Sequence, residues 1–205
     1  MPMEGSPPAR RRVGVGEGIS FQELLGKRAL ILGEVGSGKS RLTAKLLEEA
    51  ISLGYSDRIA VIDLSPDIRL PSGEVVGAPL TSYVAIGPPI KYMRPMGIRA
   101  PRLEGNSRDG VLMLAEGNAK AIEAIFYEYL KGAREILFIN DVSLYLHGGE
   151  LELLLSVISK ANTSILNGYY GVRLEKDKGS GISKRERALM EDLASRMDLL
   201  IEMDS

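Results

Sequence analysis

The fold is decided by one short stretch, Gly33-Glu34-Val35-Gly36-Ser37-Gly38-Lys39-Ser40. It fits the pattern G-x(4)-G-K-S, in which a glycine-rich turn joins a strand to a helix. The mostly apolar run Arg28 to Leu32 comes directly before it and is typical of a buried strand. Arg41 to Gly54 follows, with apolar residues on one helical face. This context predicts a phosphate-binding loop rather than a chance glycine-rich turn.

Each part of this loop has a role in binding a nucleotide. Glycines allow successive backbone N–H groups to converge on phosphate oxygens, and the positive end of the helix dipole adds to the attraction. In such loops the lysine, here Lys39, reaches the β- and γ-phosphates, and the hydroxyl of Ser40 is a ligand for Mg²⁺. We therefore expect ATP and Mg²⁺ as ligands, with Lys39 also taking part in catalysis. The expected nucleotide-binding residues are Gly33, Glu34, Val35, Gly36, Ser37, Gly38, Lys39, Ser40 and Arg41.

Composition restricts the class of protein further. The chain has 205 residues, which suits one α/β domain, and its formal net charge of −1 gives no overall attraction to nucleic acid or membrane. It contains no cysteine, which excludes disulfides and thiolate metal sites. No apolar run reaches the ~18 residues of a membrane span, and no signal-peptide pattern occurs. We expect a cytoplasmic protein without membrane contact. The lack of Cys and Trp and the single Gln22 are typical of a thermophile source.

Apolar runs and helical patterns alternate along the chain. This alternation predicts an α/β fold, a three-layer P-loop NTPase domain with a mostly parallel sheet between helices, over residues 19–205. Residues 1–18 are rich in proline, glycine and arginine and are predicted to form a mobile N-terminal tail. Ser183 and Glu186 form a capping-box pattern at the start of the last helix. The expected strands are 28–32, 58–64, 82–86, 136–139, 163–169 and 198–203, and the main expected helices are 41–54, 111–131, 150–161 and 183–196.

Two carboxylates follow apolar strands and are candidates for the chemistry beside the loop. A P-loop nucleotidase uses a carboxylate at the end of a neighbouring strand to orient the metal. Asp63 ends one buried run directly, whereas Asp141 follows another run with Asn140 between them. Either carboxylate could be a metal ligand or a catalytic base, and the sequence leaves the choice open. Asp67 is a weaker candidate, because Pro66 favours a turn there.

Three further features have alternative interpretations. The most basic stretch of the chain, residues 87–110, is a long proline-rich segment, which we predict either to face the substrate or to be a solvated connection. His147, the only histidine, lies in a glycine-containing loop, which predicts an exposed side chain rather than a catalytic one. Arg185 and Arg187 either close over a transferred phosphate or lie on an exposed helix face.

Beyond the loop, the order of motifs over most of residues 28–170 resembles the polynucleotide 5′-hydroxyl kinase family, the RNA-end kinases. The resemblance implies transfer of the γ-phosphate of ATP to the 5′ end of RNA or DNA, with Asp63 as base or metal-shell ligand and residues 91–108 binding the acceptor. The stretches that carry it after the loop are Asp63-Leu64-Ser65-Pro66-Asp67, Ile86-Gly87-Pro88-Pro89, Glu104-Gly105-Asn106-Ser107, Asn140-Asp141-Val142-Ser143 and Gly148-Gly149.

Departures from the kinase pattern leave two other hypotheses open. Ser65 replaces the second acidic residue of the family motif, and Asp141 and Ser143 stand where the family has threonine and glycine. The segments Phe138 to Leu144 and Met197 to Ile201 resemble a RecA-like or KaiC-like ATPase core, which hydrolyses ATP to drive an assembly. A third hypothesis is a nucleotide-dependent regulatory switch with negligible turnover. The sequence does not predict the oligomeric state.

Overall fold

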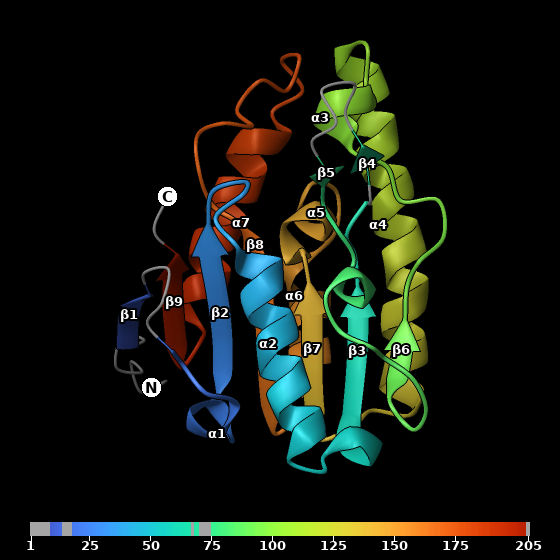
Figure 1. Ribbon diagram of the computed structural model, residues 1–205. Helices are drawn as coiled ribbons and strands as arrows, with labels where there is room; N and C mark the ends of the chain where they lie inside the picture. Colours follow the sequence, from blue (N-terminus) through green and yellow to red (C-terminus); the bar gives the residue numbers. More distant parts are fainter. Residues whose placement is uncertain (1–8, 14–17, 67, 70–74, 204–205) are drawn as a thin grey trace, which may run out of the picture.

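The computed structural model describes residues 9–13, 18–66, 68–69 and 75–203 (Figure 1). Within these residues seven strands form one parallel sheet, in the order β1-β9-β2-β8-β7-β3-β6. A separate antiparallel pair joins β4 (Ile68–Arg69) to β5 (Val75–Val76). The strands of the main sheet are β1 (Ala9–Val13), β2 (Arg28–Gly33), β3 (Ile59–Asp63), β6 (Lys91–Met93), β7 (Ile136–Asn140), β8 (Thr163–Tyr169) and β9 (Leu199–Met203).

Helices cover both faces of the sheet, because its central strands are apolar on both sides. In β2, Ala29 and Ile31 pack into the cluster that contains α1 and α2, whereas Leu30 and Leu32 pack against α4, α6 and α7. None of the described helices is long and apolar enough to cross a membrane. The helices are α1 (Phe21–Leu24), α2 (Lys39–Ser52), α3 (Pro101–Glu104), α4 (Arg108–Lys131), α5 (Val142–Leu146), α6 (Leu151–Ile158) and α7 (Ile182–Ser195), with short 3₁₀ helices η1 (Ser56–Arg58) and η2 (Leu80–Ser82). The three-layer α/β fold predicted from the sequence is confirmed.

The strand register brings polar residues together at one edge of the sheet. Asp63 at the end of β3 lies opposite Asn140 at the end of β7. Asn167 of β8 lies opposite Ile31 of β2. Ile31 comes two residues before the glycine-rich turn begins at Gly33. Because the strands are parallel, all these carboxyl ends open at the same edge, where ligands bind in sheets of this kind.

The predicted N-terminal tail is corrected in part. Residues 9–13 form β1, which pairs in parallel with β9 from Ala9 opposite Leu199 to Val13 opposite Met203. This pairing satisfies backbone N–H and C=O groups that β9 would otherwise present at a sheet edge. Residues 1–8 and 14–17 of the predicted tail lie outside the described residues, as does Asp67.

The predicted strand 82–86 is also corrected. One turn of 3₁₀ helix, η2, ends at Ser82, and β6 from the proline-rich segment takes the edge position beside β3 instead. The backbone N–H of Leu80 donates to Asp63 Oδ2 at 2.6 Å, which ties the start of this turn to the end of β3. Leu80 and Asp63 are 17 residues apart in sequence, so a tertiary contact fixes this turn.

The start of the last helix differs from the predicted capping box. The helix α7 begins at Ile182, and its N-cap is Gly181 with a φ of 84°. Glu186 does not turn back toward the helix start, because its carboxylate contacts Arg102 and His147 in the protein interior. Buried tertiary partners therefore replace the local cap at this position.

Candidate functional site

The glycine-rich turn between β2 and α2 has the backbone shape that phosphate binding requires. Gly36 and Gly38 have φ angles of 80° and 90°, a region that favours glycine. At Gly33, an added Cβ would lie 2.6 Å from Ser37 Oγ, so a larger residue would collide with the loop. The helix α2 starts at Lys39, which directs its first N–H groups and its positive dipole end at the loop. This is the backbone arrangement of a phosphate-binding loop.

Two polar side chains of the P-loop are suited to hold phosphate. Lys39 Nζ donates to the carbonyl oxygen of Glu34 at 2.6 Å, which keeps the ammonium folded over the loop. Burial lowers the pKa of Lys39, and the nearby charges of Asp141 and Glu34 partly offset that effect. Ser37 Oγ is buried and has no hydrogen-bond partner among the described residues. A buried hydroxyl that has no partner among the described residues, on the same loop as an ammonium, fits an anionic ligand.

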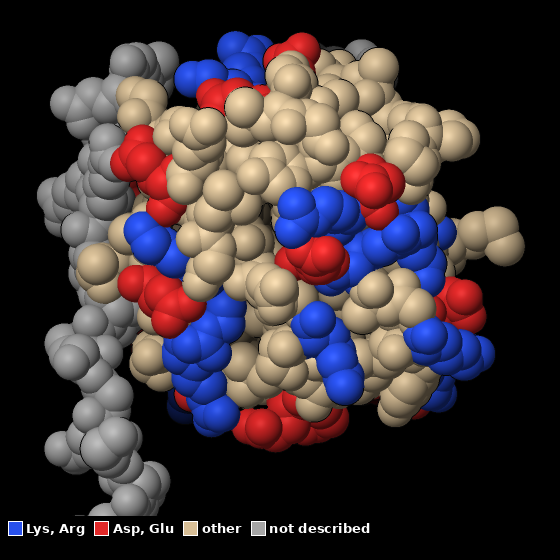
Figure 2. Space-filling view, turned by 90° about the horizontal axis from the view of Figure 1, so that it is seen from below, with Lys and Arg blue, Asp and Glu red and all other residues tan. Residues whose placement is uncertain are grey.

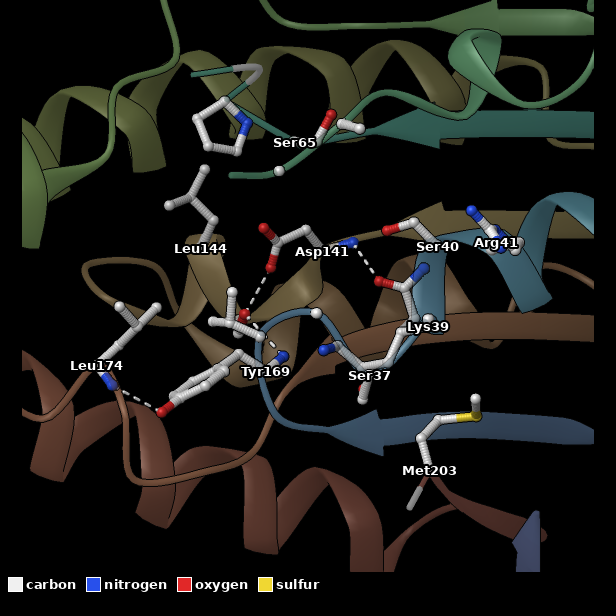
Figure 3. Close-up of a pocket in the computed structure, with 18 of the residues that line it drawn as sticks. Ser37, Lys39, Ser40, Arg41, Ser65, Asp141, Leu144, Tyr169, Leu174 and Met203 are labelled. Atoms are coloured by element: carbon white, nitrogen blue, oxygen red, sulfur yellow. Dashed lines mark hydrogen bonds between the residues drawn. The ribbon is translucent and has the colours of Figure 1, made fainter. Parts of the chain in front are cut away.

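A cleft of about 610 Å³ opens over the P-loop at the carboxyl edge of the sheet (Figure 3). Its volume lies in the range of small-molecule sites, about 300–1,000 Å³. One wall comes from the P-loop and α2, and the opposite wall comes from α3, α5 and the end of β8. Of the residues predicted to act, the cleft is lined by Val35, Gly36, Ser37, Gly38, Lys39, Ser40, Arg41 and Asp141.

The side chain beside Ser40 is an amide. Ser40 Oγ donates to Asn140 Oδ1 at 3.2 Å. The other end of the same amide, Asn140 Nδ2, donates to Asp63 Oδ1 at 2.8 Å and to the carbonyl oxygen of Ala78 at 3.3 Å. Asn140 thus lies between the P-loop serine and one of the two predicted carboxylates.

A second asparagine, which sequence analysis did not single out, links three elements of the site. Asn167 Nδ2 donates to Asn140 Oδ1 and to Thr43 Oγ1, both at 2.8 Å. Its Oδ1 accepts from the backbone N–H of Asp141 at 2.9 Å. The only signal in the sequence is an amide residue near the end of the strand, directly after the apolar pair Ile165 and Leu166. Asn167 holds β7, β8 and α2 in a fixed relation at the floor of the cleft.

Asp63 is placed below the cleft and not in its lining. It is fully buried and accepts five hydrogen bonds, two from Ser65, one from the Leu80 N–H, one from Asn140 and one from the Tyr92 hydroxyl. Burial and the adjacent charge of Asp63 raise the pKa of Tyr92 to about 12, so this hydroxyl stays a donor. The carboxylate of Asp63 therefore joins β3, η2 and β6 together.

Asp141 lines the cleft and has a strained backbone. Its φ of 62° and ψ of 57° lie in the left-handed region, which aspartate tolerates better than most residues. Ser143 Oγ donates to Asp141 Oδ1 at 2.6 Å and accepts from the Tyr169 N–H at 3.1 Å. Burial raises the pKa of Asp141, while Ser143 and the charge of Lys39 act in the opposite direction. Strained residues of this kind cluster at functional sites.

Glu34 in the P-loop connects the loop to the segment after β8. Its carboxylate accepts from the backbone N–H groups of Val35, Val172 and Arg173 at 2.8–3.1 Å. Burial alone would raise the pKa of Glu34, but these three donors outweigh burial and hold the pKa below its ordinary value. The predicted nucleotide-binding residue Glu34 thus acts on the loop conformation through its side chain.

The opposite wall of the cleft contains a buried cluster of charged residues. Glu186 Oε2 pairs with Arg102 and lies 2.6 Å from His147 Nε2, and Arg102 also donates to the carbonyl oxygen of Leu174. His147 is 6% exposed, so the prediction of an exposed loop histidine is wrong. The reason is tertiary, because α5 carries His147 inward against α3 and α7.

Several basic side chains of the segment 87–110 contact other residues of the same chain. Lys91 donates to carbonyl oxygens of α4 and its C-cap, Arg99 pairs with Glu104, and Arg102 is buried. Only residues 100–103 of the segment line the cleft. On the face at the amino ends of the strands, Lys and Arg are interspersed with Asp and Glu (Figure 2), so the described part of that face has no continuous basic surface. Arg185 and Arg187 donate to the carbonyl oxygens of Gly149 and Gly171.

The residues beside Ser40 do not fit a carboxylate-centred Mg²⁺ site. In the part of the chain that the structure describes, no three His, Asp or Glu side chains group to hold a metal ion. Protein Mg²⁺ sites at phosphates usually include one or two carboxylates. Here Ser40 contacts the neutral oxygen of Asn140, and Asp63 lies behind that amide. Of the two predicted carboxylates, the structure brings only Asp141 to the cleft.

Comparisons with known proteins add only distant likenesses. No protein-family model and no curated protein matches the sequence. The crystal structure of the flagellar accessory protein FlaH from Methanocaldococcus jannaschii aligns with 80% of this chain and 68% of its own, at 10% identity and a TM-score of 0.43. The crystal structure of Pif1 helicase from Candida albicans aligns with 90% of this chain and 37% of its own, at 14% identity and a TM-score of 0.40. At these values the functional argument rests on the geometry of the chain itself.

Proposed function

We propose that this chain binds ATP at the P-loop and hydrolyses it. The observation that carries the proposal is that Lys39, Ser40 and the carboxylate residue Asp141 line one cleft at the N-terminus of α2. The loop N–H groups and the helix dipole attract the phosphates, and Lys39 adds a positive charge that burial leaves poorly screened. We assign the role at the γ-phosphate to Asp141, because of the two predicted carboxylates it is the one that lines the cleft.

In the proposed reaction a water oxygen forms a bond to the γ-phosphorus, and the bond to the β,γ-bridging oxygen breaks to release ADP. Asp141 orients the water and accepts its proton. Burial raises the pKa of Asp141 and makes it a stronger base than an exposed aspartate. The hydrogen bond from Ser143 holds the side chain of Asp141, and the one that the Asp141 N–H donates to Asn167 Oδ1 holds its backbone. Lys39 stabilises charge that develops on the phosphate oxygens.

The strand order favours the RecA-like hypothesis over the kinase-like one. In RecA-like cores an extra strand separates the P-loop strand from the strand that ends in the acidic residues, whereas in P-loop kinases the two strands are neighbours. Here β8 lies between β2 and β7, and its residue Asn167 bridges the two sides of the gap. We therefore prefer hydrolysis of ATP over phosphate transfer to a polynucleotide as the proposed reaction.

The test is release of phosphate from ATP by the purified chain, compared with Lys39→Ala. We expect steady release that is lost in Lys39→Ala, because the variant removes the buried ammonium. Lys160→Ala changes an exposed lysine far from the P-loop and is the matched control. A parent chain that neither binds nor hydrolyses ATP, and does no better with GTP, would refute the proposal.

The kinase hypothesis has a separate test. Labelled ATP is incubated with RNA and DNA oligonucleotides that end in a 5′-hydroxyl, and label on the oligonucleotide is measured beside free phosphate. We expect label in phosphate alone. Label transferred to the 5′ end, and lost in Lys39→Ala, would replace hydrolysis with the kinase reaction.

A nucleotide-dependent switch is the second candidate, and Asn140 favours it. A neutral amide beside Ser40 would hold a metal ion less strongly than a carboxylate would, and the metal would supply less charge stabilisation to hydrolysis. Slow turnover with tight ATP binding, unaffected by protein concentration, would indicate the switch. A rate per subunit that rises with protein concentration would instead indicate the self-assembling ATPase.

A further inference from the structure

The residues around Ser40 bear on how this site uses a metal ion. We propose that the P-loop binds ATP with little dependence on Mg²⁺, because the neutral side chain of Asn140 lies beside Ser40 and the charge of Asp63 is held one hydrogen bond further away. The proposal rests on the ATP binding proposed above. It assigns to Asn140 the role of determining the metal dependence of the site.

The orientation of the Asn140 amide follows from its neighbours. Its Nδ2 faces Asp63 Oδ1 and the carbonyl oxygen of Ala78, which can only accept. Its Oδ1 faces Ser40 Oγ and the Nδ2 of Asn167. Asn167 is itself fixed, because its Oδ1 accepts from a backbone N–H, which can only donate. The network therefore directs a neutral oxygen at Ser40.

Below the cleft, both carboxylate oxygens of Asp63 accept hydrogen bonds. All five of its hydrogen bonds come from donors, which is the environment of an ionised carboxylate. Two of these donors, the Leu80 N–H and the Tyr92 hydroxyl, occupy Oδ2, and the others occupy Oδ1. Neither oxygen lines the cleft. Reaching a metal at Ser40 would require Asp63 to displace Asn140 and abandon these partners.

Asp141 does not replace the missing carboxylate. Its side chain extends from the backbone toward Leu144, and Ser40 lies on the other side of that backbone (Figure 3). Ser143 Oγ donates to its Oδ1 at 2.6 Å and holds the carboxylate on the Leu144 side. Asp141 thus points away from the serine, on the side of the cleft lined by Leu144.

This arrangement makes the metal-free nucleotide an adequate ligand. Lys39, the N-terminus of α2 and the loop N–H groups attract the phosphates without a metal. Mg²⁺ would neutralise part of the phosphate charge that these groups attract. In return the described residues beside the loop offer it only the neutral oxygens of Ser40 and Asn140. We expect these two effects on binding to offset one another, so that ATP and Mg²⁺-ATP bind about equally well.

The first measurement is the dissociation constant of ATP for the full chain by isothermal titration calorimetry, with excess Mg²⁺ and with EDTA. We expect the two constants to differ by less than about threefold, which is below the tenfold effect of 1.4 kcal/mol. Binding that is tighter in Mg²⁺ by a larger factor would overturn the proposal while leaving the proposed ATP binding intact. Absence of binding in both buffers would refute the ATP binding itself.

The second measurement exchanges the two side chains in Asp63→Asn with Asn140→Asp. The exchange keeps the total charge and preserves the hydrogen bond between the two residues with its direction reversed, since the new amide at 63 donates to the new carboxylate at 140. The amide oxygen at 63 still accepts from the Leu80 N–H and the Tyr92 hydroxyl. A carboxylate now lies beside Ser40, and we expect Mg²⁺ to tighten ATP binding by about tenfold or more.

Asp63→Asn alone is the matched control, because it removes the charge of Asp63 without placing one at position 140. We expect its ratio of constants in EDTA and Mg²⁺ to equal that of the parent chain. A lower ratio of the two dissociation constants in this control would show that Asp63 already helps to hold the metal. An unchanged ratio in the exchanged variant would show that Asn140 does not determine how ATP binding depends on Mg²⁺. Either result overturns the proposal. If the exchanged variant fails to fold, the parent ratio decides the question.

Discussion

The carboxyl ends of β3 and β7 carry the same chemical group in two different settings. Asp63 ends β3, is fully buried and accepts five hydrogen bonds. Asp141 follows β7, lines the cleft and accepts one side-chain hydrogen bond, from Ser143. The two differ because Asn140 is the last residue of β7 and lies opposite Asp63, so Asp141 comes one residue later and adopts a left-handed conformation. One residue of offset thus separates a carboxylate that holds the fold from one that faces a ligand.

The largest expected effect tests the Asp63 half of this comparison. Asp63→Ala leaves buried donors on Ser65, Leu80, Tyr92 and Asn140 without their acceptor. We expect the free energy of unfolding to fall by about 4 kcal/mol, as for a broken buried polar network. For a chain of this size that corresponds to a melting temperature lower by about 10 °C.

Thermal unfolding followed by circular dichroism measures the effect of Asp63→Ala. The exposed Asp57 provides the control Asp57→Ala, which should change the melting temperature by no more than about 1 °C. If Asp63→Ala is as stable as the control and yet loses turnover, Asp63 is the functional carboxylate and the comparison is reversed.

The next effect tests the Asp141 half. Asp141→Asn is nearly isosteric and keeps an oxygen that accepts from Ser143, but the amide cannot take a proton from water. We expect the rate of ATP hydrolysis to fall by about 100-fold, equivalent to about 2.7 kcal/mol of transition-state stabilisation. ATP affinity should stay within about threefold of the parent chain, because the phosphates are held by the P-loop.

Phosphate release at saturating ATP gives the rate for Asp141→Asn, and calorimetry gives its affinity. Asp109→Asn, an exposed aspartate of α4, is the control and should retain full activity. Unchanged hydrolysis in Asp141→Asn would remove the catalytic role from this residue.

The comparison also shows which parts of the site the sequence could predict. The P-loop could be predicted because three local patterns agree. The glycine spacing lies within Gly33 to Ser40, an apolar run comes before it and a helical pattern follows. Asp63 and Asp141 were readable as strand-end residues, but their roles depend on whether each side chain points above or below the sheet edge. That direction is set by tertiary partners such as Tyr92 and Ser143, which lie 29 and two residues away in sequence.

Other residues were missed because their partners come from distant segments. Asn167 contacts Thr43, 124 residues away, and Asn140, 27 residues away. His147 and Glu186 are 39 residues apart, and no local pattern in either segment marks them as a buried pair. Local patterning predicts elements, whereas a polar network that crosses the sheet requires the strand order to be known.

Asn167 joins the two halves of the comparison, so its removal should affect both. Asn167→Ala removes hydrogen bonds to Thr43 and Asn140 on one side and to the backbone of Asp141 on the other. We expect a loss of about 2 kcal/mol in the free energy of unfolding and a fall of about tenfold in hydrolysis. Chemical denaturation and phosphate release on the same sample measure the two effects. A loss of stability with full activity would show that Asp141 holds its position without Asn167.

The smallest effect concerns pH and again separates the two carboxylates. Burial raises the pKa of Asp141 above 3.8 in the folded chain. As pH rises above that value the unfolded chain loses this proton first, so the folded state binds more protons and the Asp141 contribution to stability falls. Asp141→Asn has no proton to lose, and its stability relative to the parent chain should therefore increase from about pH 4, close to the pKa of aspartate in an unfolded chain, toward pH 7. Urea unfolding of both proteins across that range measures the difference. A difference that stays constant or decreases with pH would mean that Asp141 is well solvated or well paired when charged, and its setting would then resemble that of Asp63.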